Sequence, residues 1–134
     1  MPDVEPFFDT NIVLYALSKD FQRKEHMAEL LNEGCTLSTQ VFAESANVMR
    51  RKVSCSIAEI ENFHDALLDV CRLRRIESST IRRALQVAGR YGYSLYDSLI
   101  IATALEADCE RLYSEDMQHG QLIDKRLTII NPFR

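Results

Sequence analysis

Short apolar runs alternate with helical segments along this chain, and this alternation limits the fold more than any other feature. Apolar runs at 4–8, 36–38 and 73–76 have the length of short strands. Two further runs lie at 111–114 and 127–131. Because no tight hairpin signal joins any of them, the pattern predicts an α/β sandwich. Its centre would be a twisted, mainly parallel sheet of about five short strands, flanked by helices.

Helical periodicity fills the intervals between these runs. It predicts helices over 11–17, 21–32, 41–53, 57–71, 81–91 and 94–108. Gly34 and Gly92 follow two of these segments and suit helix ends, and Ser56 suits the start of the fourth. The last helix is apolar around most of its circumference, which predicts burial on several sides.

Composition and charge narrow the class of protein further. The chain has 134 residues, the usual size of one domain, so we expect a single domain over 1–134. Hydrophobic residues make up 46% and charged residues 27%, which excludes an intrinsically disordered chain. A net charge of −4 excludes the strongly basic surface of a protein that coats nucleic acid without specificity.

The start of the chain and its cysteines are typical of a cytoplasmic protein. The first ten residues contain acids and no Lys or Arg, unlike a signal peptide, and the longest apolar stretch, 99–105, is too short to span a bilayer. The cysteines Cys35, Cys55, Cys71 and Cys109 form no C-x-x-C pair. We therefore expect no membrane segment, a cytoplasmic location and four reduced, mostly buried thiols.

Four acids occupy positions where strands end or helices begin. Asp9 and Asp116 follow predicted strands, and Glu44 and Asp97 lie in the opening turns of predicted helices. Each also has an ordinary structural explanation. Asp9 suits a helix N-cap, and Asp116 suits a turn. Glu44 suits the exposed edge of a helix, and Asp97 suits a capping box with Ser94.

Taken together, the four acids predict a cation site. In a parallel α/β fold their positions all lie at one edge of the sheet. Two carboxylates about 5 Å apart repel by roughly 3 kcal/mol at an effective dielectric constant of about 20, so four of them need bound cations or protons. A cluster of hard oxygen ligands without His or Cys suits Mg²⁺ or Mn²⁺ best.

These acids lie in sequence blocks that resemble a known family. The blocks are, in order, Phe8-Asp9-Thr10-Asn11, Ser38 followed by Glu44, residues 96–102 and residues 112–116. They resemble the motifs of PIN-domain proteins, in particular VapC-type toxin ribonucleases of toxin–antitoxin pairs. The resemblance covers residues 7–131, and the four motifs are specific only as a set. Ser114 departs from the family, which more often has Thr at that place.

The resemblance implies a fold, an activity and a site. The fold is a PIN-like three-layer sandwich, and the activity is hydrolysis of RNA phosphodiester bonds by an endonuclease that needs Mg²⁺ or Mn²⁺. The implied catalytic residues are Asp9, Glu44, Asp97 and Asp116, of which Asp9, Asp97 and Asp116 would hold the metal. The implied supporting residues are Thr10, Asn11, Ser38 and Ser114. As the toxin of a type II toxin–antitoxin system, the protein would bind RNA, a cognate antitoxin and a second copy of itself.

Separate basic groups would hold the RNA, since the acids repel phosphate. The candidates are Arg50, Arg51 and Lys52, then Arg74 and Arg75 with Arg72, then Arg82 with Arg83. Each cluster also suits a solvated surface or a contact with the antitoxin.

Two other functions fit parts of the pattern. A haloacid-dehalogenase-like phosphatase would use Asp9 as its nucleophile, but such enzymes usually have a second Asp where this chain has Asn11. Trapping of an aspartyl-phosphate on Asp9 would identify it. A non-catalytic module that dimerises or binds a partner needs no acid cluster, so Mg²⁺ titration separates it from a metal-dependent nuclease.

Overall fold

The computed structural model describes residues 4–134, which form six α-helices and a six-stranded sheet. The helices are α1 (Thr10–Val13), α2 (Phe21–Asn32), α3 (Thr39–Arg51), α4 (Ile57–Val70), α5 (Ser78–Tyr91) and α6 (Leu95–Glu106), with a 3₁₀ helix, η1 (Leu14–Leu17), after α1. The strands are β1 (Phe7–Phe8), β2 (Cys35–Ser38), β3 (Cys71–Arg74), β4 (Arg111–Tyr113), β5 (Leu122–Ile123) and β6 (Leu127–Ile130).

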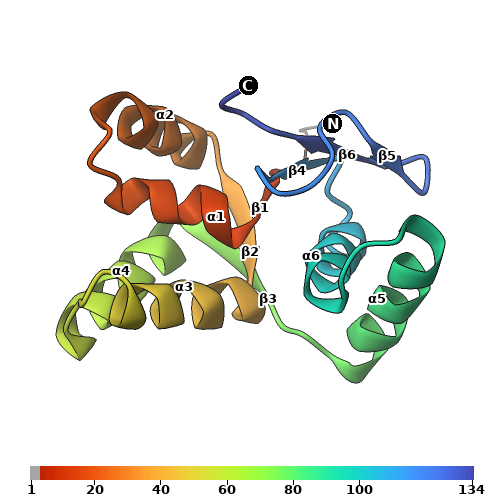
Figure 1. Ribbon diagram of the computed structural model, residues 1–134, viewed down its shortest axis with the longest axis horizontal. Coiled ribbons are helices and arrows are strands. Elements are labelled where there is room, and N and C mark those ends of the chain that lie inside the picture. Colours follow the sequence, from red (N-terminus) through yellow and green to blue (C-terminus); the bar gives the residue numbers. More distant parts are fainter. Residues whose placement is uncertain (1–3) are drawn as a thin grey trace.

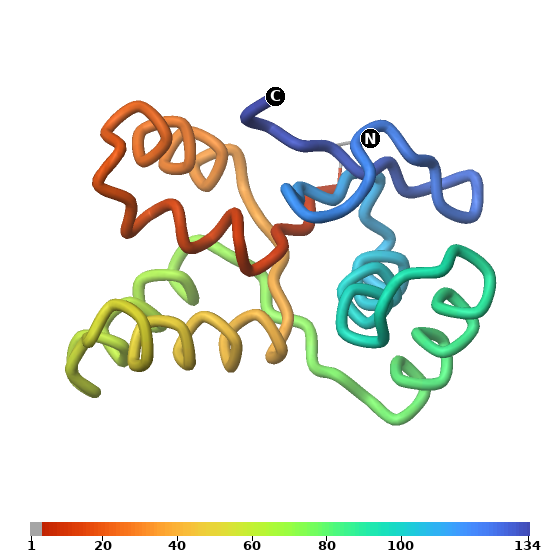
Figure 2. The backbone as a smooth tube through the Cα atoms, in the orientation of Figure 1, coloured from red at the N-terminus to blue at the C-terminus, as the bar shows by residue number. Residues whose placement is uncertain are grey.

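The sheet is mainly parallel, as predicted. Its strand order is β3-β2-β1-β4-β6-β5, and every neighbouring pair is parallel except β5 with β6. Helices α1 to α4 lie on one side of the strands and α5 and α6 on the other (Figure 1), so the sheet is the middle of three layers. The chain crosses between these two sides through the segment that follows β3 (Figure 2). The α/β class is therefore confirmed, with six strands instead of about five.

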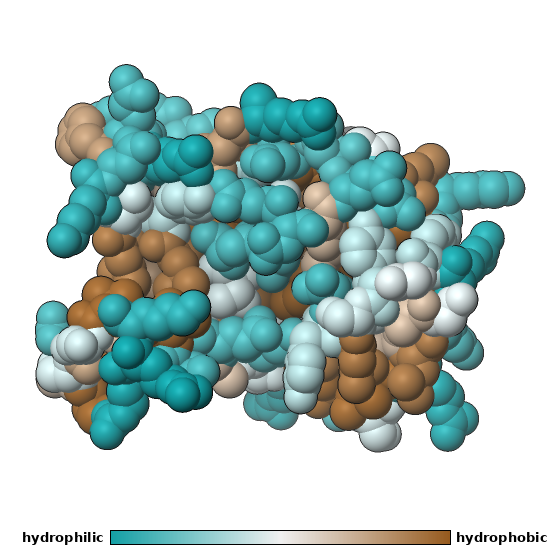
Figure 3. Space-filling model, viewed as in Figure 1, coloured by the Kyte–Doolittle hydropathy of each residue, from teal (hydrophilic) through white to brown (hydrophobic). Residues whose placement is uncertain are grey.

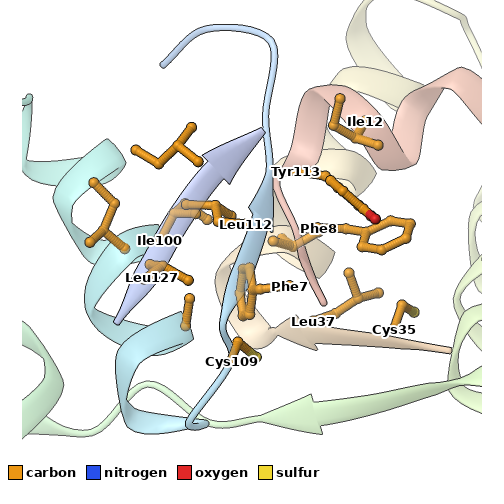
Figure 4. Packing of buried hydrophobic residues seen from close by; sticks show 14 of the residues in the cluster. Phe7, Phe8, Ile12, Cys35, Leu37, Ile100, Cys109, Leu112, Tyr113 and Leu127 are labelled. Carbon is orange, nitrogen blue, oxygen red and sulfur yellow. The ribbon is translucent and has the colours of Figure 1, made fainter. Parts of the chain in front are cut away.

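The centre of the sheet is also the centre of the core. Phe7 and Phe8 of β1 are fully buried, because β1 has strands on both edges and helices on both faces. Leu112 of β4, Leu127 of β6 and Ile100 of α6 belong to the same buried cluster (Figure 4). Asp9, the next residue after β1, is thus attached to the centre of the buried core.

Helix α6 is buried along most of its length. Every residue from 98 to 105 is buried, which confirms the burial predicted from its nearly uniform apolar surface. Within residues 4–134, neither α6 nor any other helix has both the length and the apolar character needed to cross a membrane.

The sequence did not predict the hairpin formed by β5 and β6. Asp124 and Lys125 lie in the turn with φ of 48° and 60°, a left-handed conformation usually taken by Gly or Asn. The turn therefore lacks the Asn-Gly or Asp-Gly signal that marks most short hairpins. Strand β3 also begins at Cys71, two residues before the predicted start at residue 73.

The expectation of four reduced thiols was wrong for two cysteines. Cys35 and Cys71 form a disulfide bond across the parallel pair β2–β3, with their Cα atoms 4.7 Å apart. A separation of 36 residues without a recognisable motif hid this pairing from the sequence. Cys55 and Cys109 are free thiols, and burial raises the pKa of Cys109 to about 11.

Reduction of this disulfide is expected to lower the free energy of unfolding by about 2 kcal/mol, because the bond restricts the unfolded chain. Urea unfolding with and without a phosphine reductant measures the difference. A Cys35→Ser/Cys71→Ser double variant is the control, since the reductant should not change its unfolding curve. Superimposable curves for the wild-type protein in the two conditions would show that the bond does not contribute to stability.

Candidate active site

The site is built where three parallel strands end. Asp9 directly follows β1, Ser38 is the last residue of β2, and Ser114 directly follows β4. Since β1 pairs with both β2 and β4 in parallel, these ends share one edge of the sheet. The strand order also reverses here, because β2 and β3 lie on one side of β1 and β4 lies on the other. In open α/β sheets, the carboxyl ends of the strands at such a reversal are the usual position of a ligand site.

Asp9 is buried and tightly held. Its side chain is 6% exposed. Oδ1 accepts a hydrogen bond from the Thr10 amide (2.7 Å), and Oδ2 accepts one from the Ser114 hydroxyl (2.8 Å). The first bond caps α1, so the N-cap explanation is correct. The second shows that the same carboxylate is also tied to the loop after β4.

Three of the four supporting residues named from the sequence hold the acids and their loop. The Thr10 hydroxyl donates to Glu44 Oε1 (2.7 Å), which connects α1 to α3. The Ser114 hydroxyl accepts from the Asp116 amide at 3.3 Å, and Asn11 Oδ1 accepts from the amide of residue 115 at 3.4 Å. Ser38 instead caps α3, where its hydroxyl accepts from the Val41 amide at 3.3 Å.

Asp97 is only half of a capping box. Its amide donates to the Ser94 hydroxyl at 3.2 Å, but among the described residues the Ser94 amide does not donate back to the Asp97 carboxylate; the Ser94 hydroxyl does lower the pKa of Asp97. The Asp97 side chain is half-buried. The reciprocal half of the capping box is therefore missing, and the Asp97 carboxylate is also influenced by the charges of Asp116 and Glu44.

The four acids line one groove of about 340 Å³ between α1, α3 and α6. The other residues that line it are Thr10, Asn11, Leu14, Gln40, Val48, Lys52 and Ile100. Asp9 lies at the bottom of the groove and Asp116 is exposed. Side chains that are separated by up to 107 positions in the sequence thus lie around a single space.

The acids also act on one another electrostatically. Burial raises the pKa of Asp9 to about 6, the bonds from Ser114 and Thr10 oppose this, and the charges of Asp97 and Glu44 add to it. Burial likewise raises the pKa of Asp97, and the charge of Asp116 raises it further. Both shifts come first from burial, and repulsion among the acids adds to it.

The donor chemistry of the groove fits a hard divalent cation. Among residues 4–134, none of the four acids forms an ion pair with Lys, Arg or His, and carboxylate oxygens are the ligands that Mg²⁺ and Mn²⁺ prefer. In the present side-chain positions, residues 4–134 contain no group of three His, Cys, Asp or Glu side chains close enough together to hold a metal. The groove therefore has the right ligands without a closed coordination set.

Of the basic residues predicted to contact RNA, Lys52 lines this groove and the arginines do not. Arg74 and Arg75 line a different one beside β3, and Arg82 lines a third on α5, together with two other arginines. Arg50 and Arg51 are exposed in the last turn of α3. The five are distributed over three surfaces, so they do not form one basic patch with the acids.

Sequence reasoning missed Gln40, which lines the groove and is 9% exposed. Its Nε2 donates to the Tyr96 carbonyl at 3.1 Å, and its Oε1 has no hydrogen-bond partner among the described residues. The available signal was its spacing, because Gln40 lies four residues before Glu44 on the same side of a helix.

A sequence profile of the PIN domain matches residues 7–122, which is most of the chain. No curated protein is similar enough in sequence to count as a match.

Several solved structures share the fold. One is a toxin–antitoxin complex from Klebsiella pneumoniae, 19% identical over 95% of this chain and 97% of that one, with a TM-score of 0.70. Another is Mycobacterium tuberculosis VapC20, described as a toxin that cleaves the sarcin–ricin loop, 17% identical over 82% and 88%, with a TM-score of 0.66. A third is VapBC2 from Rickettsia felis bound to a promoter DNA fragment, 18% identical over 92% and 95%, with a TM-score of 0.65. At such identities the likeness shows the fold alone.

Proposed function

The chain belongs to the PIN-domain family, and we propose that within it this protein is an endoribonuclease dependent on Mg²⁺ or Mn²⁺. Proteins of this family are typically nucleases that use divalent metals. The observation that carries the proposal is that Asp9, Glu44, Asp97 and Asp116 line one groove and that none of them has an ion-pair partner among residues 4–134; burial of Asp9 there raises its pKa to about 6. A protein that only binds a partner has no reason to gather such charge.

Asp9, Asp97 and Asp116 would hold the ion, which when bound lowers the pKa of a water and offsets the charge of the phosphate. The chain's own contribution is to fix these ligands. The Thr10 amide and the Ser114 hydroxyl fix both oxygens of Asp9. The Ser114 hydroxyl also accepts from the amide of Asp116, so one side chain sets the relative position of two ligands.

Glu44 is the proposed acceptor of the proton from the attacking water. The Thr10 hydroxyl holds its Oε1, which leaves Oε2 to orient the water and accept its proton. The water oxygen bonds to phosphorus, the bond from phosphorus to a ribose oxygen breaks, and that oxygen takes a proton from solvent. Each residue in this scheme either positions a carboxylate or moves one proton.

RNA cleavage in the presence and absence of metal tests the proposal. Wild-type protein incubated with labelled RNA should produce fragments in Mg²⁺ or Mn²⁺ and none in EDTA, because the acid groove repels phosphate without a cation. Excess Mg²⁺ added after the EDTA should restore cleavage and serves as the control for irreversible damage. Fragments that form equally fast in EDTA would refute a metal-dependent mechanism.

The biological role we propose is that of the toxin in a type II toxin–antitoxin pair, acting in the cytoplasm as one domain over 1–134. The similar solved structures include proteins described as toxins or as toxin–antitoxin complexes, which supports this role. Exposed apolar side chains are also present, such as Ile81 and Leu85 of α5, which are 44% and 58% exposed. Hydrophobic surface is visible over α5 and beside α4 (Figure 3), and it suits an antitoxin and a second copy of the chain as partners.

A further inference from the structure

One side of α3 forms a wall of the acid groove along its whole length. Gln40, Glu44, Val48 and Lys52 are spaced four residues apart and all line the groove, as expected for positions on one side of a helix. Helices α1 and α3 lie side by side (Figure 1), so the groove runs between them. With about 1.5 Å per residue, Lys52 lies about 12 Å along the helix from Glu44.

The chemistry of the groove changes along this wall. Glu44 and the other acids lie at one end, Leu14 and Val48 form an apolar middle, and Lys52 lies at the far end. Lys52 is exposed, and within residues 4–134 it has no ion-pair partner. It is also the one Lys or Arg that lines the groove in the described part of the chain. The far end therefore offers a free positive charge to an anionic ligand.

We propose that Lys52 binds a backbone phosphate of single-stranded RNA, a few nucleotides away from the phosphate that is cleaved at the acids. This inference rests on the proposed ribonuclease function. Successive phosphates on one strand are a few Å apart along its axis, about 3.4 Å in B-form DNA, so about 12 Å corresponds to a few nucleotides. Unstacked bases of the intervening nucleotides can contact Leu14 and Val48, which a paired duplex would not allow.

Arg51 provides a matched control for Lys52. It precedes Lys52 in the chain, carries the same charge and is also exposed, but it does not line the groove. General attraction between a basic helix end and RNA should depend on both residues. A phosphate contact inside the groove should depend on Lys52 alone.

The test measures RNA binding in a protein that cannot cleave. An Asp9→Asn variant is titrated against a fluorescent oligouridylate dodecamer at several salt concentrations, and binding is followed by anisotropy. Adding Lys52→Ala should weaken binding roughly fivefold and reduce the slope of log affinity against log salt by about 0.7, the value for one lost phosphate contact on a single strand. Adding Arg51→Ala should leave both quantities unchanged, and Lys52→Arg should retain the wild-type slope.

Equal losses with Lys52→Ala and Arg51→Ala, or no loss with Lys52→Ala, would overturn the inference while RNA binding itself persists. Failure of the Asp9→Asn protein to bind the dodecamer would also overturn it. The proposed function is judged separately, by Mg²⁺-dependent cleavage with the wild-type protein. Cleavage that persists while Lys52 proves irrelevant would therefore refute the phosphate contact and leave the nuclease proposal standing.

Discussion

Asp9→Asn is expected to reduce Mg²⁺-dependent RNA cleavage by about 10³-fold or more, a loss typical of removing a group that acts in the transition state. Asn keeps the shape of the side chain and can still cap α1 by accepting from the Thr10 amide. It removes the negative charge that the proposed metal site needs at its most buried position. Initial rates of fragment formation from a labelled RNA measure the effect.

The control for this substitution is Asp65→Asn. Asp65 is an exposed residue of α4, so the variant changes the net charge by the same amount away from the groove. It should cleave RNA at the wild-type rate. Cleavage by the Asp9→Asn protein within a few-fold of wild type would rule out the role proposed for Asp9.

The same Asp9→Asn substitution is expected to stabilise the metal-free protein at neutral pH by about 3 kcal/mol. This figure follows from the pKa of Asp9, which is raised from 3.8 to about 6 in the folded protein, mainly by burial. Above pH 6 the folded protein must hold a charged carboxylate in a place that disfavours charge. Asn has no such charge, so the variant avoids this penalty and retains the cap.

The pH dependence gives the sign of this effect. Between pH 4 and 6 the folded state keeps a proton on Asp9 that the unfolded state has released, so the contribution of Asp9 to stability falls as the pH rises through this range. The difference in the free energy of unfolding between Asp9→Asn and wild type should be smallest near pH 4 and largest above pH 6. Urea unfolding in EDTA across this range provides the measurement. A constant difference across the range would show that Asp9 titrates normally.

Elements with strong local signals were predicted well from the sequence. The α2 segment was predicted at 21–32, where the structure has it, and Ser56 begins α4 with a complete capping box. The shared edge of Asp9 and Asp116 followed from strand alternation alone, because parallel strands bring their carboxyl ends together. Local propensity and topology were sufficient for these features.

Features that depend on contacts between distant segments were not predictable in this way. The disulfide between Cys35 and Cys71 requires the pairing register of β2 and β3, which the sequence does not encode locally. The position of Lys52 in the groove, with Arg51 outside it, depends on how α3 rotates against α1. A single residue of rotation turns a side chain by about 100°, so a basic cluster in a sequence cannot reveal which member faces the site.

The double role of Asp9 has a consequence for descendants of this protein. Because the same carboxylate starts α1 and lies at the bottom of the groove, most replacements would damage the helix start together with the chemistry. Asn and Ser are exceptions, since both are good N-caps without charge. Lineages that lose the proposed RNA cleavage but keep the fold as a binding platform should therefore carry Asn or Ser at this place more often than Ala or a larger side chain.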